Sequence, residues 1–431
     1  MTKEIKWSDI AAIGTIEQWL SKELRRLGLS DDTDPSKLAK KQLKLYKEKR
    51  DEERRVRKEL QQKAWRAYQK AHIVHLGQTI FYVDQADIDI FDIADLENRR
   101  ESNEIPSLND LNDLAKALNL SISEIRWLCY HRDVDNNSHY HYWNVPKRDG
   151  GSRLISAPKP KLKQAQTWIS RNIVEQLPIH GAAHGFVAGR STVSNAACHA
   201  GAEIVIKLDL ENFFPTIHWR RVKGLFRKAG YIEQVATLLA LLCSEAPREE
   251  MNIKGQRYFV ALGERALPQG APSSPALTNH LCFRLDCRLS GLATKMGCQY
   301  SRYADDLTFS SKDSDLAIGQ LIGAVKMIVG KEGFIVHNKK TRILRSGRRQ
   351  KITGLVVNEA PGKPPARVPR YFVRTLRAAL HNREQGRPGK GESLVQLKGW
   401  IAYIHMTDPD RAKPFYARLK RLEESNKGDN A

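Results

Sequence analysis

The chain has 431 residues and a formal net charge of +22, which comes from 71 basic and 49 acidic side chains. The length allows two or three domains with a large buried core, and the 41% of hydrophobic residues excludes a mostly disordered chain. The charge favours a polyanionic partner. The longest apolar stretch, residues 235–243, is too short to span a bilayer, and no signal peptide opens the chain. We therefore predict a cytoplasmic protein that does not enter a membrane.

Six cysteines are spread over the chain, and no two of them form a Cys-x-x-Cys pair. The spacing therefore favours neither a zinc ribbon nor a thioredoxin-like motif. In an intracellular protein we expect reduced thiols in or near the core. All six are predicted to be structural: Cys129, Cys198, Cys243, Cys282, Cys287 and Cys298.

The chain as far as about residue 70 is charged and helix-prone, and residues 37–70 are predicted to form one long helix. Residues 36–70 contain 14 Lys or Arg and 5 Asp or Glu, a local net charge of +9. Apolar residues recur at helical spacing, so one side is predicted to pack while the rest is solvated: Val56, Leu60, Ala64, Tyr68 and Ala71. A solvated helix and an RNA-contacting arm both remain open, and the excess of one sign favours the arm.

Residues 107–131 are predicted to form two short helices. Ser107 is a candidate N-cap of the first, Asn119 ends it, and Ser121 caps the second. The outline is that of a helix-turn-helix, but such pairs are common and most do not enter a DNA groove. We therefore expect this pair to pack rather than to contact DNA.

From about residue 139 to 358 the chain is rich in predicted strands, and two of them carry acidic residues. Residues 204–209 form a β-branched run that ends in Asp209, as in a buried strand that delivers a carboxylate at its end. Residues 300–303 and 307–310 flank a tight turn with Asp305 and Asp306. This pattern predicts a hairpin with two adjacent carboxylates at its tip.

Adjacent carboxylates repel each other and need a compensating cation. Mg²⁺ with oxygen ligands is the natural choice, with Mn²⁺ as a substitute. Two such ions about 3.5–4 Å apart activate an attacking hydroxyl and stabilise a leaving pyrophosphate. Asp209 and Asp305 are predicted to bridge the ions, with Asp306 as a lesser ligand or an outer-shell partner.

Two motifs carry a resemblance to reverse transcriptases. Residues 303–306 resemble their Tyr-x-Asp-Asp box, and residues 209–214 resemble their first palm motif. The resemblance implies an α+β right-hand polymerase, with fingers, a palm with an antiparallel sheet, and a short helical thumb. It assigns residues 131–358 to fingers and palm and residues 359–431 to an RNA-binding thumb. Residues 1–130 remain as a basic helical extension that contacts RNA or a partner.

Further segments follow in the order of that family. Residues 145–155 resemble the fingers hairpin, in which Lys147 and Arg153 face the incoming deoxynucleoside triphosphate. Gly150 and Gly151 permit the positive φ of its turn, although a basic hairpin taken alone is more often just solvated.

The loop 267–275 leads into a predicted helix over residues 276–289, with Ser273 or Ser274 as its cap. Gln269 resembles the residue that lies against the nucleotide's sugar and base. Phe214 matches the steric gate that excludes a ribose 2′-hydroxyl, and its alternative role is in the core.

Residues 333–342 resemble the fourth palm motif, in which a lysine is a candidate proton donor to the leaving pyrophosphate. Lys340 matches that lysine best, and Lys339 is close enough to keep the choice open. Leu210 follows the first aspartate and is a further predicted metal-binding position. Residues 352–358 resemble the primer-grip turn. Three helices are predicted after it, over residues 367–382, 395–406 and 414–424, with a flexible turn around 386–391.

Two segments are similar to signatures of the bacterial retron enzymes. Residues 195–199 match Asn-Ala-x-x-His, and residues 352–354 resemble Val-Thr-Gly with Ile in place of Val. Asn195 and His199 share one face if the segment is helical. The resemblance implies a role for this pair with the enzyme's own structured RNA. The structural alternative is a helix packed on the palm, with His199 bonded to a backbone carbonyl.

The resemblance therefore implies an RNA-directed DNA polymerase of a retron. Such an enzyme binds a cognate non-coding RNA and copies part of it from a 2′-hydroxyl primer into branched RNA–DNA, called msDNA. It further implies antiphage defence with an effector or toxin protein. Two alternatives remain: a defence-associated reverse transcriptase that is not a retron, and an RNA-binding scaffold that neutralises a toxin.

Overall fold

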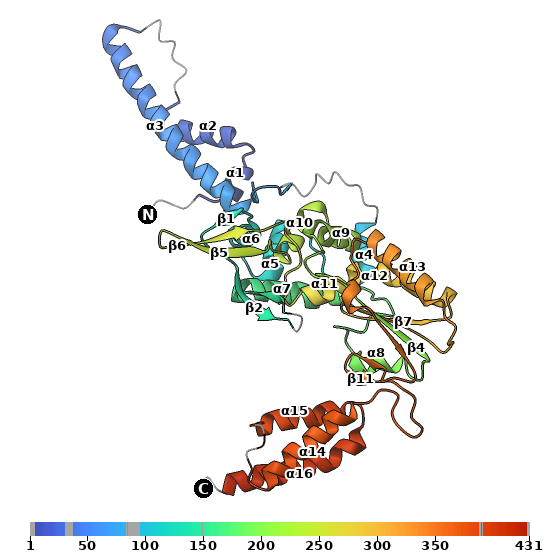
Figure 1. The fold of residues 1–431 in the computed structure, drawn as a ribbon. Coiled ribbons are helices and arrows are strands. Elements are labelled where there is room, and N and C mark those ends of the chain that lie inside the picture. Colours follow the sequence, from blue (N-terminus) through green and yellow to red (C-terminus); the bar gives the residue numbers. More distant parts are fainter. Residues whose placement is uncertain are drawn as a thin grey trace.

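The computed structural model describes residues 5–30, 38–82, 84, 95–147, 150–387, 389 and 391–428, with side chains as far as residue 424. Arg148 and Asp149 of the predicted fingers turn, and Lys37, lie outside this range. Figure 1 shows a central mixed body with a long helical arm on one side and a helical C-terminal lobe on the other. No helix among the described residues is long and apolar enough to cross a membrane.

The arm consists of α1 (Trp7–Ala11), α2 (Ile16–Arg26) and α3 (Lys40–Ala71). The Thr15 side chain accepts a hydrogen bond from the backbone of Gln18 and starts α2 with a capping box. Ala64 and Ala67 of α3 are small enough for α2 to approach closely, and they form a separate buried cluster with Trp19 and its neighbours. The single long helix predicted from the spacing is therefore confirmed, with its start at Lys40.

Helices surround the central body. They are α4 (Leu96–Ser102), α5 (Leu111–Leu118), α6 (Ile122–Cys129), α7 (Pro160–Asn172), η2 (Val174–Gln176), α9 (Trp219–Ala229) and α10 (Glu233–Leu242). Asp110, and not Ser107 as predicted, caps α5, because its carboxylate accepts the Asp113 N–H at 2.8 Å. Asn119 ends α5 in the left-handed conformation and Ser121 caps α6, as predicted. The leucine faces of α5 and α6 are buried in the main core, as expected of a packing pair.

A four-stranded antiparallel sheet, the palm sheet, has the order β7-β8-β4-β9. Its strands are β4 (Ile204–Asp209), β7 (Gln299–Tyr303), β8 (Asp306–Ser311) and β9 (Arg342–Arg345). The β-branched run of β4 lies inside the sheet and is almost entirely buried, which explains its unbroken apolar pattern. The helix α13 (Ile318–Lys331) packs beside α12 (Phe283–Lys295) on this sheet, and η3 (Asn338–Lys340) precedes β9.

Two smaller sheets complete the body. A hairpin is formed by β2 (Tyr140–Pro146) and β3 (Ser152–Pro158), and β1 (Val134–Asp135), β6 (Gln256–Ala261) and β5 (Arg248–Ile253) form a three-stranded sheet. Within the β2–β3 turn, Gly150 has a positive φ of 86°, whereas Gly151 does not. Only one of the two glycines therefore needs the conformational freedom that the sequence suggested.

The prediction of one helix over residues 276–289 is wrong in one respect. It is broken at Cys282 into α11 (Ser274–Leu281) and α12. Neither serine caps it through a side chain: Ser273 makes no capping bond, and the Ser274 hydroxyl donates to the Pro268 carbonyl at 2.8 Å. That bond fastens the preceding loop to the helix instead.

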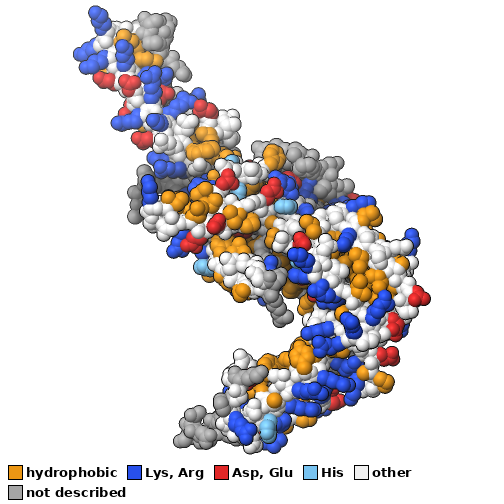
Figure 2. Space-filling model, in the orientation of Figure 1, with side chains coloured by type: hydrophobic (Ala, Val, Ile, Leu, Met, Phe, Trp, Pro, Cys, Tyr) orange, Lys and Arg blue, Asp and Glu red, His pale blue; other side chains and the backbone are white. Residues whose placement is uncertain are grey.

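The C-terminal lobe contains α14 (Arg370–Glu384), α15 (Leu394–His405) and α16 (Pro409–Gly428), which follow the short hairpin of β10 (Lys351–Ile352) and β11 (Leu355–Val356). Helix α16 begins five residues earlier than predicted, because the Asp408 carboxylate accepts the Arg411 N–H and Pro409 occupies the first position. The apolar cluster of the lobe extends to the palm sheet, where it includes Val205 of β4. Figure 2 shows a broad hollow between this lobe and the central body.

Four of the six cysteines are buried, as predicted, and no disulfide joins any of the six. Cys198 and Cys287 are exposed. The expectation that all six lie in or near the core is wrong for these two.

Candidate active site

The three aspartates meet at one end of the palm sheet. The register of β4 and β8 places Asp209 directly opposite Asp306, and Asp305 stands in the turn before β8. The backbone fixes both strands here. The Leu210 N–H donates to the Asp305 carbonyl at 3.0 Å, and the His337 N–H donates to the Asp209 carbonyl at 2.7 Å. The predicted acidic hairpin is present, and it lies beside the acid delivered by β4.

The turn that carries Asp305 has only two residues between the paired Tyr303 and Asp306. Ala304 occupies its first position with a φ of 57°, a conformation that costs a non-glycine residue free energy. The chain packs tightly around it. A Cβ on Gly185 would lie 2.6 Å from the Ala304 nitrogen, so only glycine fits there. The surrounding fold therefore holds a strained turn that presents the acidic pair.

Burial and neighbouring charges shift the pKa values of two of the acids. Burial, together with the neighbouring Asp209, raises the pKa of Asp305 to about 6. Burial also raises the pKa of Asp306, against the opposing effect of Lys207. Two partly buried carboxylates that resist ionisation are expected where a cation is needed to hold them charged.

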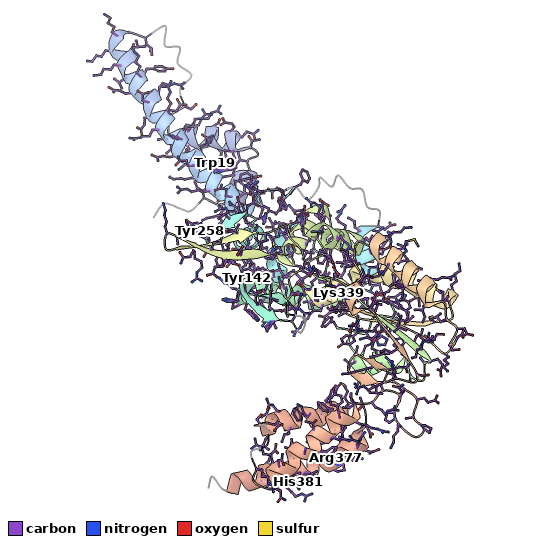
Figure 3. All side chains as sticks on the ribbon, in the orientation of Figure 1. Trp19, Tyr142, Tyr258, Lys339, Arg377 and His381 are labelled. Carbon is purple, nitrogen blue, oxygen red and sulfur yellow. The ribbon has the colours of Figure 1, made fainter. Side chains whose placement is uncertain are left out.

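Two lysines contact the acids directly. The Lys340 ammonium lies 3.1 Å from Asp209 Oδ1, and the Lys207 ammonium lies 3.9 Å from Asp306 Oδ1. Lys339, which Figure 3 places in the central body, accepts a bond from Arg342 through its carbonyl. Of the two lysines that the sequence left open, Lys340 is thus the one in contact with a predicted catalytic acid. Lys207 was missed, although β-strand alternation puts it on the same face as Asp209.

A cavity of about 380 Å³ opens beside the acids. Its wall includes seven predicted site residues: Lys147, Arg153, Asp209, Leu210, Gln269, Asp305 and Lys340. The wall also includes polar residues that the sequence reasoning did not single out: Ser152, Glu211, Asn212, Glu245 and His337. One cavity wall therefore contains both cations of the β2–β3 hairpin and carboxylates of the palm sheet.

The loop that carries Gln269 is tied to the β2–β3 hairpin. The Ser156 N–H donates to the Gln269 carbonyl at 2.7 Å. Gly270 has a φ of 119°, and a Cβ there would lie 3.0 Å from the Ser156 carbonyl oxygen. Glycine is therefore required for the loop and the hairpin to approach this closely.

Phe214, the predicted steric gate, does not line the cavity, unlike most of the other predicted site residues. Phe213, which is 3% exposed, belongs to the cavity wall, whereas Phe214 does not. Phe214 is half-buried, packs against the main core and makes an edge-to-face contact with Phe213. The core alternative for Phe214 thus gains support, and its role as a gate stays a prediction.

A buried ion pair is bonded to the turn that carries Asp305. Arg302 and Asp286 are both fully buried, and the guanidinium donates to the carboxylate at 2.7 and 2.9 Å. The same guanidinium donates to the Ala304 carbonyl at 3.2 Å. Arg302 therefore links the turn to α12. The sequence reasoning missed this pair, because no local pattern joins residues on a strand and a helix.

Asn195 and His199 form a buried network with the two strands of the acidic hairpin. The His199 ring lies 2.6 Å from the Ser310 hydroxyl and 2.7 Å from the Ser301 hydroxyl. Ser301 in turn donates to the Asn195 side chain at 2.8 Å. Burial lowers the pKa of His199 to about 4, so the ring is neutral at pH 7.

This network corrects two expectations for the Asn-Ala-x-x-His segment. Helix α8 (Thr192–Ala197) ends before His199, and His199 bonds to two serine hydroxyls rather than to a backbone carbonyl. Asn195 and His199 are each 1% exposed, and their role with the enzyme's RNA stays a prediction. The pair joins α8 to the strands that carry Asp305 and Asp306.

The donor set suits a hard divalent cation. Among the described residues, no group of three or more His, Cys, Asp or Glu side chains stands ready as a complete metal cage. Mg²⁺ rarely uses such a cage, because it binds through one or two carboxylates together with waters and substrate phosphates. The raised pKa values of Asp305 and Asp306 fit a site that a cation completes.

Comparison with known proteins gives a consistent picture. A family model described as reverse transcriptase (RNA-dependent DNA polymerase) matches residues 145–359. The chain is similar to the Retron Mx162 reverse transcriptase of Myxococcus xanthus, with 49% identity over 96% of this chain and 87% of the relative. It is 30% identical to the Retron Ec86 reverse transcriptase of Escherichia coli, over 74% of this chain and 91% of the relative.

Among solved structures, a telomerase from Candida albicans with a fragment of telomeric RNA matches with a TM-score of 0.41 and 10% identity. That match covers 66% of this chain and 56% of the telomerase. The family match, with the mixed helices and antiparallel sheet seen here, confirms the predicted α+β right-hand polymerase fold.

Proposed function

The chain belongs to the retron reverse transcriptases and is an RNA-directed DNA polymerase; on that premise we propose which residues carry out its reaction. Enzymes of this family use divalent metal ions. We assign two Mg²⁺ ions to Asp209, Asp305 and Asp306, with Leu210 beside them. The observation that carries the proposal is the meeting of these acids with two lysines and a cation-lined cavity.

The reaction joins a primer hydroxyl to the α-phosphorus of a deoxynucleoside triphosphate and breaks the bond to the pyrophosphate. The metal ions supply charge neutralisation at the attacking and leaving oxygens. Lys147 and Arg153, which line the same cavity, bind the triphosphate, and Gln269 lies against the sugar and base. Lys340 gives a proton to the pyrophosphate as it leaves, which offsets the negative charge that develops on the leaving oxygen.

We further propose that the template is a cognate structured non-coding RNA, copied from a 2′-hydroxyl primer into msDNA. The net charge of +22 supports a polyanionic partner. A cytoplasmic role in antiphage defence, with an effector or toxin protein, completes the proposal. It rests on the family and on no contact in the structure.

The metal assignment is tested by Asp209→Asn and Asp305→Asn. We expect each variant to lose at least about 10³-fold in Mg²⁺-dependent incorporation of deoxynucleotides on an RNA template, because removal of a charge at the reacting phosphate costs about 4 kcal/mol. Asp315→Asn, at an exposed site beyond β8, is the matched control. Near wild-type rates in either site variant would overturn the assignment. Wild-type biological activity without polymerisation would indicate the scaffold function.

The template proposal is tested by sequencing the nucleic acid that copurifies with the protein. We expect a short DNA joined to a folded RNA, with a branch that survives nucleases specific for 3′,5′ linkages. RNA alone, or DNA without a branch, would contradict retron synthesis and favour the other defence-associated enzymes.

The gate is tested by comparing Phe214→Ala with Phe213→Ala. If Phe214 is the gate, its truncation alone raises the incorporation of ribonucleotides relative to deoxynucleotides by about 10-fold or more, which corresponds to about 1.4 kcal/mol. A change only in Phe213→Ala would assign the gate to the residue that lines the cavity. Unchanged selectivity in both would place both rings in the core.

A further inference from the structure

We infer that the outward side of α3 is a binding surface for RNA. The inference rests on the proposed function, because it assigns a place on the chain to the RNA partner. Helix α3 has 32 residues and is therefore about 48 Å long at 1.5 Å per residue. Figure 1 shows it extending away from the central body and away from the C-terminal lobe.

One side of α3 is already occupied. Leu60, Ala64 and Ala67 pack with α1 and α2 in the cluster that includes Trp19. A helix that turns its apolar side inward has no stripe left to insert into a membrane surface. The opposite side is solvated, and its chemistry decides what it binds.

That opposite side is basic along most of its length. With 100° per residue, the positions within about 60° of the side opposite Leu60 carry seven cations and two acids, Glu48 and Asp51. All seven cations are exposed: Lys40, Lys44, Lys47, Arg54, Arg55, Lys58 and Arg66. Two of them pair with acids on α3, Arg54 with Asp51 and Arg55 with Glu52. Figure 2 shows basic side chains along the arm.

Five cations of this outward side have no acidic partner within 4 Å among the described residues: Lys40, Lys44, Lys47, Lys58 and Arg66. In a helix with many charges, i,i+3 and i,i+4 pairing is the usual way to offset repulsion. Here these basic side chains repel one another without such pairing over about 39 Å of helix, from Lys40 to Arg66. A row of phosphates offsets such repulsion and releases its own counterions in doing so.

An aromatic ladder lies at the end of this row near the body. Trp65 is 45% exposed and stacks on Tyr68, with centroids 5.5 Å apart and an interplanar angle of 13°. Tyr68 stacks on His72 at 4.1 Å, and Trp7 meets both rings edge-on. The ladder fixes the Trp65 ring in place. An ordered, exposed indole beside a row of cations is a surface on which an unpaired base stacks.

The occupant is thus RNA with a backbone along the lysines and an unpaired base at Trp65. An acidic protein would also meet the lysines, but it would not require an exposed ring at the end of the row. The probe for the test is a labelled RNA hairpin with a stem of about 16 base pairs, the span of a double-stranded-RNA module, and a single-stranded tail.

The full chain is compared with a variant that carries Lys40→Gln, Lys44→Gln, Lys47→Gln and Lys58→Gln. Glutamine keeps the helix propensity of lysine, so α3 should stay folded, and circular dichroism checks this. The matched control neutralises four exposed lysines on α12, after β8 and on α13: Lys295, Lys312, Lys326 and Lys331. Affinity is measured over a range of salt concentrations.

We expect the slope of log affinity against log salt to become less steep by about 3 in the arm variant, because each phosphate that a lysine neutralises adds about 0.7–0.9 to that slope. The control should keep the wild-type slope. Trp65→Ala should weaken binding of the tailed hairpin by about 10-fold and leave the blunt hairpin unchanged. An unchanged slope in the arm variant, or an equal decrease in the control, would overturn the inference.

Nucleotide incorporation on a short primed template separates this inference from the proposed function. The arm variant should retain wild-type incorporation, because none of its four positions lines the cavity. If wild-type protein fails to incorporate nucleotides, the proposed function fails. If it incorporates them and the arm variant binds RNA as wild type does, only the inference fails.

Discussion

The palm sheet holds a cluster of acids and the arm carries an excess of basic residues, and the two groups differ in burial. In the palm sheet, Asp305 and Asp306 are partly buried and held against Asp209, and their pKa values are raised. On α3, the lysines are exposed and spaced along a helix. Partly buried like charges that are held together need a compact ion at a fixed point. Exposed like charges spread over about 39 Å need an extended polyanion, whose attraction salt screens.

The same contrast applies to ion pairs. Arg302 and Asp286 are fully buried in the body, whereas Arg57 and Glu17 pair on the surface of the arm. In the first pair, water cannot replace a missing partner; in the second, it can. Substitutions in the two regions should therefore differ in size.

The largest expected effect comes from Asp286→Asn. It leaves the Arg302 charge buried without its counter-charge, and we expect a loss of about 3–5 kcal/mol in the free energy of unfolding, measured by denaturant titration. The double substitution of Arg302→Met with Asp286→Leu should recover part of that stability. It should not recover activity, because it removes the bond from Arg302 to the Ala304 carbonyl. Equal stability of wild type and Asp286→Asn would show that the pair is solvated.

A second effect concerns the network under the acidic hairpin. Ser301 gives its hydroxyl proton to Asn195, so the neutral His199 ring must donate to Ser301 and accept from Ser310. His199→Ala leaves both hydroxyls without this partner, at about 1–3 kcal/mol each. We expect kcat to fall by about 10-fold or more with an unchanged KM for deoxynucleotides, since the hairpin loses its alignment. Ser301→Ala in the same background should add little. A rise in KM alone would assign His199 to binding rather than to positioning.

A third, smaller effect is pH-dependent and concerns the metal-free protein. The pKa of Asp305 is raised from 3.8 to about 6, so the folded state holds this proton more tightly than the unfolded state. Its stabilising contribution is complete below pH about 4 and is lost as pH rises through about 6. As pH rises between these two values, the melting temperature of Asp305→Asn should therefore increase by a few degrees relative to that of wild type. Excess Mg²⁺ should remove this difference in melting temperature between the variant and wild type. A constant difference across pH would contradict the raised pKa.

The smallest effect is expected on the arm. Glu17→Gln removes one partner of Arg57, whose guanidinium bonds to both carboxylate oxygens at 2.8 and 2.9 Å. Because both side chains are largely solvated, the free energy of unfolding should change by less than about 1 kcal/mol. It should change less still at high salt. A loss comparable to that of Asp286→Asn would show that the arm and the body do not differ in the way described.

Residues near one another in sequence carried most of what could be predicted. The β-branched run before Asp209, the acidic pair between two short strands and the periodic helix 37–70 each depend on local patterns. Capping was less certain, because several polar residues compete for one helix end. Asp110 and Asp408 provide the caps, where Ser107 and a start at Pro414 were expected.

The sequence by itself determined that acids, cations and a basic helix exist, and in which order. Only the tertiary structure decided which of them meet. Lys340 contacts Asp209 from 131 positions away, Arg302 reaches Asp286 on another element, and His199 lies under a hairpin about a hundred residues further on. Such contacts depend on how strands align in a sheet and how helices pack on it. That alignment comes from burial of the whole core, and no local spacing encodes it.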